Sequence, residues 1–325
     1  MSIRNAGGRM AVHLDPRDKF SKLVDLTESR VLLAPHITFV CGGPVDVTAT
    51  SNHSIRNMLM NLSAKMPAKS QRFTLAENFK DWKDGYSNLA DFENDIAAIS
   101  SVIVVILESA GSLTELGLFF ANDALRRKMV VVVHSGHHSA ESFIKFGILN
   151  PLEADNEEAV LVYEIDSNNI DSVQESEVVE ILQAVWEISE KVDKTSQFDP
   201  SNHGHNIFLT FQIIDLFTIL TKFEIAKYLS ILKISFTKRQ LQSALYILTK
   251  FKLLKQEKRS SQTFYFVPPE ISDRVQLAFQ RDGARRYDSR AIKLEVLAFY
   301  RAESASNHSF KNRMKLWERH VEVST

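Results

Sequence analysis

Residues 101–133 read SVIVVILESAGSLTELGLFFANDALRRKMVVVV, and this stretch decides the fold. It opens with the apolar run 101–107 and closes with the apolar run 129–133, and both runs are rich in β-branched residues. Continuous runs of this kind are typical of strands buried on both faces of a parallel sheet. A loop and a crossover helix, which we expect at 118–125, fit between them. The stretch therefore predicts a right-handed βαβ unit.

Strands and helices alternate on both sides of this unit. Further strands are predicted at 37–41, 72–75 and 161–165. Helices are predicted at 54–66, 91–100 and 175–192, and a short helical patch at 19–26. Alternation of this kind predicts an α/β fold with a parallel, Rossmann-like sheet, which we assign to residues 30–195. The polar residues 195–205, with Pro200 and Gly204, are expected to be a linker.

Two acids of the central stretch are candidate site residues. Glu108 follows the first strand, and Glu115 is expected in the first turn of the helix, with Ser112 or Thr114 as its cap. Ligands of open α/β sheets bind at the carboxyl ends of strands, so both carboxylates are expected to face a small molecule. Gly111 would let the loop approach that molecule closely. The alternative is that Glu115 complements the helix dipole and Glu108 is solvated.

Further candidates follow the strands at 37–41 and 72–75. Gly42 and Gly43 leave backbone N–H groups free to face a ligand, and Cys41 is expected to be a small buried residue beside that loop. Glu77 projects from a strand end and is the better site candidate among the remaining acids. Glu93 and Asp95 lie in the early turns of the next predicted helix, where we expect them to complement the helix dipole.

Residues 206–268 have a different pattern. Helices are predicted at 207–220, 222–229 and 239–251, with Thr237 as cap of the third, and strands at 253–257 and 263–267. Three helices and a two-stranded hairpin describe a winged helix-turn-helix, which we place within a mainly α domain over residues 206–325. The polar face of the third helix, which enters the major groove in such folds, comprises Lys238, Arg239, Gln240, Gln242 and Ser243. Lys258 and Arg259 would contact phosphates from the hairpin.

Charge divides the chain in the same place. Residues 201–325 hold 21 Lys and Arg against 11 Asp and Glu, whereas residues 1–200 hold 18 against 29. A basic module favours a polyanionic partner such as DNA or RNA. Two alternatives stay open: the two halves attract each other, or the second module docks to protein.

The remaining composition narrows the class of protein. The N-terminal 15 residues have no apolar core, and the longest apolar stretch, residues 207–220, is too short to span a bilayer. The single cysteine excludes an internal disulfide and suits a reducing cytoplasm. His134, His137 and His138 form a cluster, but no acidic or cysteine partner has metal-ligand spacing, so no metal is expected.

The central motif carries a resemblance. Residues 108–117, ESAGSLTELG, followed by 121–129, ANDALRRKM, resemble the signature of nucleoside 2-deoxyribosyltransferase-like proteins, and more closely the toxic effectors encoded beside bacterial retrons. Residues 39–43, FVCGG, and 76–79, AENF, match the same effectors. The resemblance covers residues 30–150, and an enzymatic domain followed by a winged helix fits the rest of the chain.

This resemblance implies cleavage of an N-glycosidic bond. Glu115 matches the family's catalytic glutamate, and Glu108 or Glu77 would hold sugar hydroxyls or position water. Substrate-binding residues expected from the loops are Cys41, Gly42, Gly43, Ser109, Gly111 and Ser112. Ala110 stands where related loops often carry proline. The expected substrate is NAD or another nucleotide, with no cofactor; a water acceptor would make the protein a hydrolase, and another acceptor a transferase.

The resemblance also implies partners. An effector of this type is expected to act in anti-phage defence, held inactive by a reverse transcriptase bound to its msDNA, an RNA–DNA hybrid. We further expect a homo-oligomer or filament that forms through that complex. The expected location is the cytoplasm, without membrane contact. The competing interpretation is a non-catalytic nucleotide sensor that regulates transcription through DNA binding.

Overall fold

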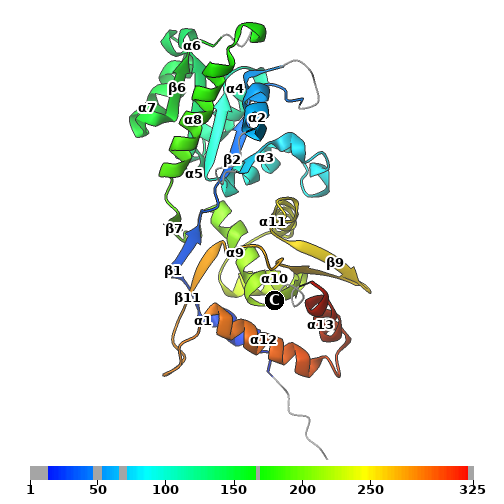
Figure 1. The fold of residues 1–325 in the computed structure, drawn as a ribbon. Coiled ribbons are helices and arrows are strands. Elements are labelled where there is room, and N and C mark those ends of the chain that lie inside the picture. Colours follow the sequence, from blue (N-terminus) through cyan, green and yellow to red (C-terminus); the bar gives the residue numbers. More distant parts are fainter. Residues whose placement is uncertain (1–13, 47–52, 66–71, 166–168, 321–325) are drawn as a thin grey trace, which may run out of the picture.

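The computed structural model of the chain describes residues 14–46, 53–65, 72–165 and 169–320. Its upper part in Figure 1 is built on a five-stranded sheet in the order β3-β2-β4-β5-β6, and every neighbouring pair is parallel. The strands are β2 (Ile37–Cys41), β3 (Arg72–Thr74), β4 (Val102–Ile106), β5 (Met129–His134) and β6 (Val160–Tyr163). The mixed α/β class and the parallel sheet predicted from the apolar runs are therefore confirmed.

Helices cover both faces of this sheet. Side chains alternate along β4, so that Val102, Val104 and Ile106 pack with α2 and α8, while Ile103 and Val105 pack with α3 and α4. The helices of the upper part are α2 (Ile55–Lys65), α3 (Leu89–Ile99), α4 (Ala110–Phe120), α5 (Asp123–Arg126), α6 (Ser135–Ser139), α7 (Asn150–Asp155) and α8 (Glu175–Lys191). Residue 66, the predicted end of the first of these, lies outside the described residues.

Short helices complete this part of the chain. They are η1 (Ala76–Asn78), η2 (Trp82–Asp84), η3 (Lys145–Leu149), η4 (Glu157–Ala159) and η5 (Ile170–Ser172).

The crossover helix differs from the prediction. It was expected at 118–125 with Ser112 or Thr114 as cap, but α4 begins at Ala110 with Ser109 as its N-cap. The cause is a capping box, in which the side chains of Ser109 and Ser112 each bond the other's backbone N–H. Glu115 therefore lies in the second turn of α4. Asn122 caps the separate helix α5, which ends the longer helix that the pattern suggested.

The lower part contains helices and a second, antiparallel sheet in the order β8-β10-β9. Its elements are α9 (His203–Leu216), β8 (Ile219–Thr221), α10 (Lys222–Ile231), α11 (Lys238–Lys250), β9 (Lys255–Arg259), β10 (Gln262–Phe266), α12 (Ser289–Glu303) and α13 (His308–His320). Thr237 caps α11 as predicted. The helix predicted at 207–220 instead begins at His203, and its last predicted residues belong to β8.

A third sheet joins distant parts of the chain. β1 (Val24–Leu32) pairs antiparallel with β7 (Thr195–Gln197) on one side and with β11 (Val275–Phe279) on the other. The patch predicted as a helix at 19–26 is therefore helix α1 (Pro16–Leu23) followed by a strand. The expected linker at 195–205 contains β7 and the start of α9, because hydrogen bonding to β1 orders these polar residues.

This architecture places the carboxyl ends of β2 and β4 beside each other, since the two strands are parallel neighbours. The loops that follow them, with Gly42, Gly43 and Glu108, therefore meet at one edge of the sheet. Among the described residues, no helix is both long and apolar enough to cross a membrane.

Candidate active site

The Glu108 carboxylate lies at the amino end of α2. It accepts hydrogen bonds from the backbone N–H groups of Ile55 at 2.6 Å, Gly43 at 2.7 Å and Arg56 at 3.0 Å. A Cβ atom on Gly42 would lie 2.8 Å from the same carboxylate, so this loop needs glycine to approach it. A helix amino end is a favourable place for a negative charge. Glu108 thus holds the loop after β2, the loop after β4 and α2 in one arrangement.

The loop after β4 is fixed by two serines. Ser109 Oγ accepts from the Ser112 backbone at 3.0 Å and donates to the Gly42 carbonyl at 3.2 Å. The Ser109 backbone N–H in turn donates to Ser112 Oγ at 3.1 Å. Gly111 lies exposed in the first turn of α4. The expected substrate loops are therefore joined to each other by direct hydrogen bonds.

Glu115 projects from α4 toward the end of β2. There the buried Cys41 thiol donates a hydrogen bond to its carboxylate. Burial raises the pKa of Glu115, the charge of Arg56 opposes that rise, and the charge of Glu77 adds to it. Burial also raises the pKa of the Cys41 thiol, which keeps the thiol protonated as a donor. Cys41 is thus the small buried residue that the sequence predicts, in contact with the candidate catalytic acid.

Arg56 connects the first loop with Glu77. Its side chain is 5% exposed, its Nε donates to the Gly43 carbonyl at 2.6 Å, and its Nη1 donates to the Val40 carbonyl at 3.2 Å. Its Nη2 pairs with the carboxylate of Glu77, whose side chain is 55% exposed. These backbone contacts fix the guanidinium, so Glu77 is held by a cation that cannot easily follow it into solvent.

Glu93 is a further candidate site residue, which the sequence pattern assigned to the helix dipole instead. It lies on α3 and is 9% exposed, and burial together with the charges of Glu115 and Glu77 raises its pKa to about 7. Its place next to Phe92 in a helix whose other buried residues are mostly apolar could have revealed it, because a dipole-compensating acid needs no burial. A carboxyl group with this pKa exchanges its proton near neutral pH.

Glu77, Glu93 and Glu115 form a carboxylate cluster around Arg56. The charges of Glu115 and Glu77 raise the pKa of Glu93, the charge of Glu77 raises that of Glu115, and the Arg56 guanidinium lowers both pKa values. Like charges in a confined site disfavour full ionisation, and Glu93, with a pKa of about 7, keeps its proton in part of the population at neutral pH. The cluster can therefore present an anion and a proton donor to the same bound molecule. A group of three His, Cys, Asp or Glu ligands suited to a metal ion is absent from the described residues.

The residues expected to contact nucleic acid lie elsewhere. Lys238 and Arg239 are exposed at the start of α11, and Lys258 is exposed on β9. Gln242 accepts a hydrogen bond from Lys222, and Arg259 pairs with Glu257 at 2.8 Å. Ser243 was expected on the polar face of α11, but it is buried. It is buried because its hydroxyl bonds the Gly85 carbonyl of the upper part at 2.9 Å.

The histidines at the end of β5 and in α6 make local contacts. His138 pairs with Glu153 at 2.6 Å and lies 2.7 Å from the Lys145 ammonium group. His134 accepts a hydrogen bond from the backbone of Gly136 at 2.9 Å. A structural role explains these two side chains.

Comparisons with known proteins agree with one another. The chain is 36% identical to an Escherichia coli protein of retron Ec86 that is named as a ribosyltransferase/DNA-binding protein. The 126 matched residues are 38% of this chain and 39% of the relative. The chain is 28% identical over 156 residues to the similarly named Escherichia coli protein of retron Ec73, covering 42% of this chain and 49% of the relative. Each match thus spans less than half of the relative. The family model of the STM3845 retron effector protein matches residues 52–256, most of the chain, which therefore belongs to this retron effector family.

Proposed function

We propose that the upper part is a Rossmann-like N-glycosidase that hydrolyses a nucleotide, with NAD as the preferred substrate. The carboxylate cluster carries this proposal, because it offers a proton donor and an anion beside the loops at the carboxyl ends of β2 and β4. The relatives' names, which include ribosyltransferase, support a glycosyl-transfer type of chemistry. In this proposal the chain is a toxin of anti-phage defence, restrained by a retron reverse transcriptase and its msDNA.

Glu115 is the anionic member of the cluster in the proposed reaction. The C1′–N bond breaks, its electron pair leaves with the base, and positive charge develops on C1′ and the ring oxygen. Glu115 faces this charge as a carboxylate, or attacks C1′ to form a glycosyl ester that water then opens. Arg56 favours its ionised form, since the guanidinium charge is the largest influence opposing the rise in the pKa of Glu115. Water finally supplies the hydroxyl at C1′, and its proton returns to the acid that protonated the base or, with NAD, passes to solvent.

Glu93 is the proton donor in the same reaction. It is the more buried acid and has a pKa of about 7, so it is protonated in part of the population at neutral pH. A neutral base needs a proton on another ring atom, such as N7 of a purine, to leave as a neutral molecule. Nicotinamide, in contrast, leaves NAD as a neutral molecule without any added proton. Glu77, fixed by Arg56, would hold the sugar hydroxyls, and Glu108 would position the loops.

Glu93→Gln is expected to separate these two substrate classes. Turnover of nucleotides with a neutral base should fall about 100-fold or more, the scale of a lost general acid, while NAD cleavage changes far less. Because the raised pKa leaves Glu93 protonated below pH 7, wild-type activity on neutral bases should decline as pH rises through about 7. The measurement is chromatography of products from NAD and from deoxynucleotides across that pH range.

Asp91→Asn is the matched control, because Asp91 is an exposed acid on the same helix. If Glu93→Gln lowered the turnover of NAD and of neutral-base nucleotides equally, Glu93 would not be the general acid. A wild-type protein that cleaves none of these nucleotides would contradict the enzymatic proposal and favour the nucleotide sensor.

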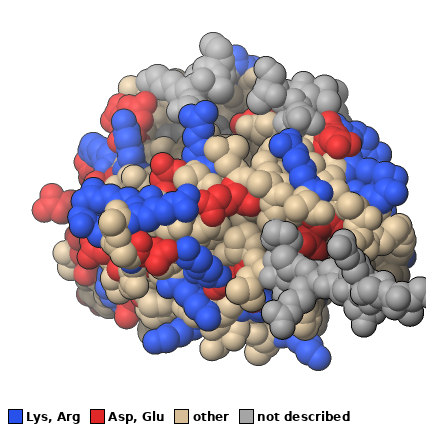
Figure 2. All heavy atoms as spheres, turned by 90° about the horizontal axis from the view of Figure 1, so that it is seen from below, with Lys and Arg blue, Asp and Glu red and all other residues tan. Residues whose placement is uncertain are grey.

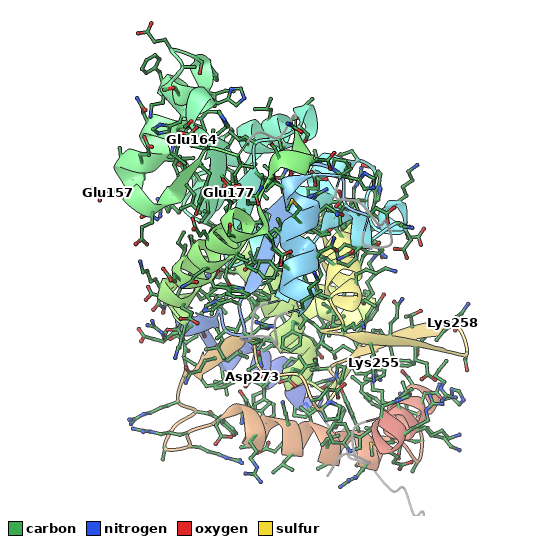
Figure 3. All side chains as sticks on the ribbon, turned by 45° about the horizontal axis from the view of Figure 1, so that its top comes forward. Glu157, Glu164, Glu177, Lys255, Lys258 and Asp273 are labelled. Carbon is green, nitrogen blue, oxygen red and sulfur yellow. The ribbon has the colours of Figure 1, made fainter. Side chains whose placement is uncertain are left out.

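We further propose that α9 to β10 form a winged helix that binds nucleic acid. The order of helix, strand, two helices and hairpin supports this, as does the DNA-binding part of the relatives' names. Figure 3 shows Lys258 near the tip of the β9–β10 hairpin, which projects from the body of the molecule. Seen from below, Lys and Arg side chains are interspersed with Asp and Glu (Figure 2). The hairpin and the start of α11 are therefore the surface that we propose to contact phosphates.

Reversing Lys238, Arg239 and Lys258 to Glu is expected to weaken binding to an RNA–DNA hybrid. Three lost phosphate contacts should reduce the slope of log K against log salt by about 2 to 3, because each contact releases counterions. Fluorescence anisotropy with a labelled hybrid at several salt concentrations measures this slope.

Reversal of three exposed cations of the upper part, Lys65, Lys80 and Arg127, is the control and should leave the slope unchanged. Binding by the wild-type protein that does not depend on salt would favour a protein partner for this module.

A further inference from the structure

Residues 76–86, here called the Glu77 segment, run from the active site to helix α11. The segment begins with η1, which contains Glu77, and continues through η2. Asp81 accepts a hydrogen bond from the Tyr246 hydroxyl at 3.0 Å and pairs with the Lys250 ammonium group. Lys250 is the first influence that holds the pKa of Asp81 below its usual range. The same α11 face thus provides both a hydroxyl and a charge to this segment.

Aromatic packing adds to these polar contacts. Phe79, two residues after Glu77, stacks on Phe251 just beyond the end of α11, with ring centroids 5.3 Å apart and planes inclined by 19°. Gly85 lies against the Tyr246 ring so closely that a Cβ atom there would be 2.3 Å from Tyr246 Cγ. The segment is therefore in van der Waals contact with α11 near both of its ends.

Helix α3, which carries Glu93, rests on the same face of α11. Phe92 makes an edge contact with Tyr246 at 6.4 Å and another with Phe79 at 5.7 Å. Asp95 accepts from the Tyr86 hydroxyl at 2.6 Å, which ties α3 to the end of the segment. Two members of the carboxylate cluster, Glu77 and Glu93, thus stand on elements that α11 contacts directly.

We infer that Tyr246 and Lys250 of α11 are positioning residues for the carboxylate cluster, acting through Asp81 on the segment that carries Glu77. The inference rests on the proposed glycosidase function for its catalytic consequence. Among the described residues, Arg56 joins Glu77 to the end of β2 and the loop after it, so a displaced segment moves the anion away from a guanidinium that backbone carbonyls hold in place. The lower part of the chain then completes the site, and α11 has a partner within its own chain.

Lys250→Glu in the full chain tests this inference, because it places a second negative charge beside Asp81. We expect kcat to fall about tenfold with a smaller change in KM, since small displacements of catalytic groups have large effects on rate. Lys250→Arg should keep nearly wild-type activity, and the exchange of charges in Asp81→Lys with Lys250→Glu should recover part of the loss. Lys252→Glu, at an exposed lysine of the same region, is the matched control.

Hydrogen exchange of the backbone amides of residues 76–86 provides a reading that needs no substrate. Exchange should be faster in Lys250→Glu than in Lys250→Arg or Lys252→Glu. Wild-type exchange together with wild-type kcat in Lys250→Glu would overturn the inference. If Lys250→Glu does not fold, Tyr246→Phe replaces it, because this change removes only the hydroxyl bond to Asp81. Hydrogen exchange of residues 76–86 should then be faster than in the wild-type protein, by less than is expected for Lys250→Glu, and unchanged exchange would overturn the inference. If the wild-type protein cleaves no nucleotide, the proposed function fails while the exchange data still test the contact.

Discussion

Glu115→Gln is expected to lower kcat for nucleotide cleavage about 100-fold or more. Glutamine keeps the shape of the side chain and can still accept from the Cys41 thiol, but it removes the charge that faces the developing oxocarbenium ion. Loss of one electrostatic group of this kind commonly has an effect of that size. Steady-state rates with NAD and with deoxynucleotides, at matched protein concentration, measure it.

Folding should not suffer from this change. Burial raises the pKa of Glu115, so its charged form opposes folding at neutral pH and glutamine removes that penalty. The melting temperature of Glu115→Gln should therefore equal or exceed that of the wild-type protein. Glu141→Gln, at an exposed acid of the same half, is the matched control. Wild-type turnover by the Glu115→Gln protein would rule out Glu115 as the catalytic carboxylate.

Glu224→Gln is expected to lower the free energy of unfolding by about 3 kcal/mol, the scale of a broken buried ion pair. Glu224 pairs with Arg17 at 2.8 Å and with Arg313 at 2.5 Å, and both arginine side chains are 3% exposed. The hydroxyl of the buried Tyr300 also accepts from Arg17, at 3.0 Å. Removing the carboxylate leaves two buried guanidinium groups with less compensation. Urea denaturation, read from the midpoint at unchanged slope, measures the loss.

The pH dependence of this effect has a defined sign. Burial alone would raise the pKa of Glu224, but the charges of Arg313 and Arg17 and the bonds to Thr221 lower it below its ordinary 4.5. A lowered pKa gives stability that is present above pH 4.5 and is lost as pH falls through the folded-state value. The difference between wild type and Glu224→Gln should thus be constant at neutral pH and shrink in acid. Glu295→Gln, which breaks the exposed pair with Arg285, should cost at most about 1 kcal/mol.

Apolar runs predicted the sheet because each central strand is buried on both faces. The crossover helix was misplaced because its start depends on the paired hydrogen bonds of Ser109 and Ser112, which outweigh the apolar pattern that begins later. The strand β1 was missed because only three of its nine residues are buried, and its partners lie far away in sequence. Local pattern is informative where burial is continuous and weak where distant pairing supplies the order.

The candidate site divides along the same line. Glu115 and the glycine loop could be found from the sequence because their spacing is local and resembles a known signature. The burial of Glu93 could have been suspected from its apolar neighbours on the helix, but the rise of its pKa could not, because part of it comes from Glu115 and Glu77, which are distant in sequence. The contact of α11 with residues 76–86 was equally hidden, since Ser243 and Tyr246 read as an ordinary helix face until the partner surface is known.

The pairing of β1 with β11 bears on the order in which the protein is made. A ribosome releases residues 24–32 long before residues 275–279, so β1 must wait for most of the chain with one edge unpaired. Its other partner, β7, arrives earlier but bonds only three of its residues. A nascent chain that stops before residue 275 therefore exposes one edge of β1. Such an edge can pair with another chain, which favours aggregation over folding to the native structure. Translation beyond residue 279 thus becomes a condition for pairing both edges of β1.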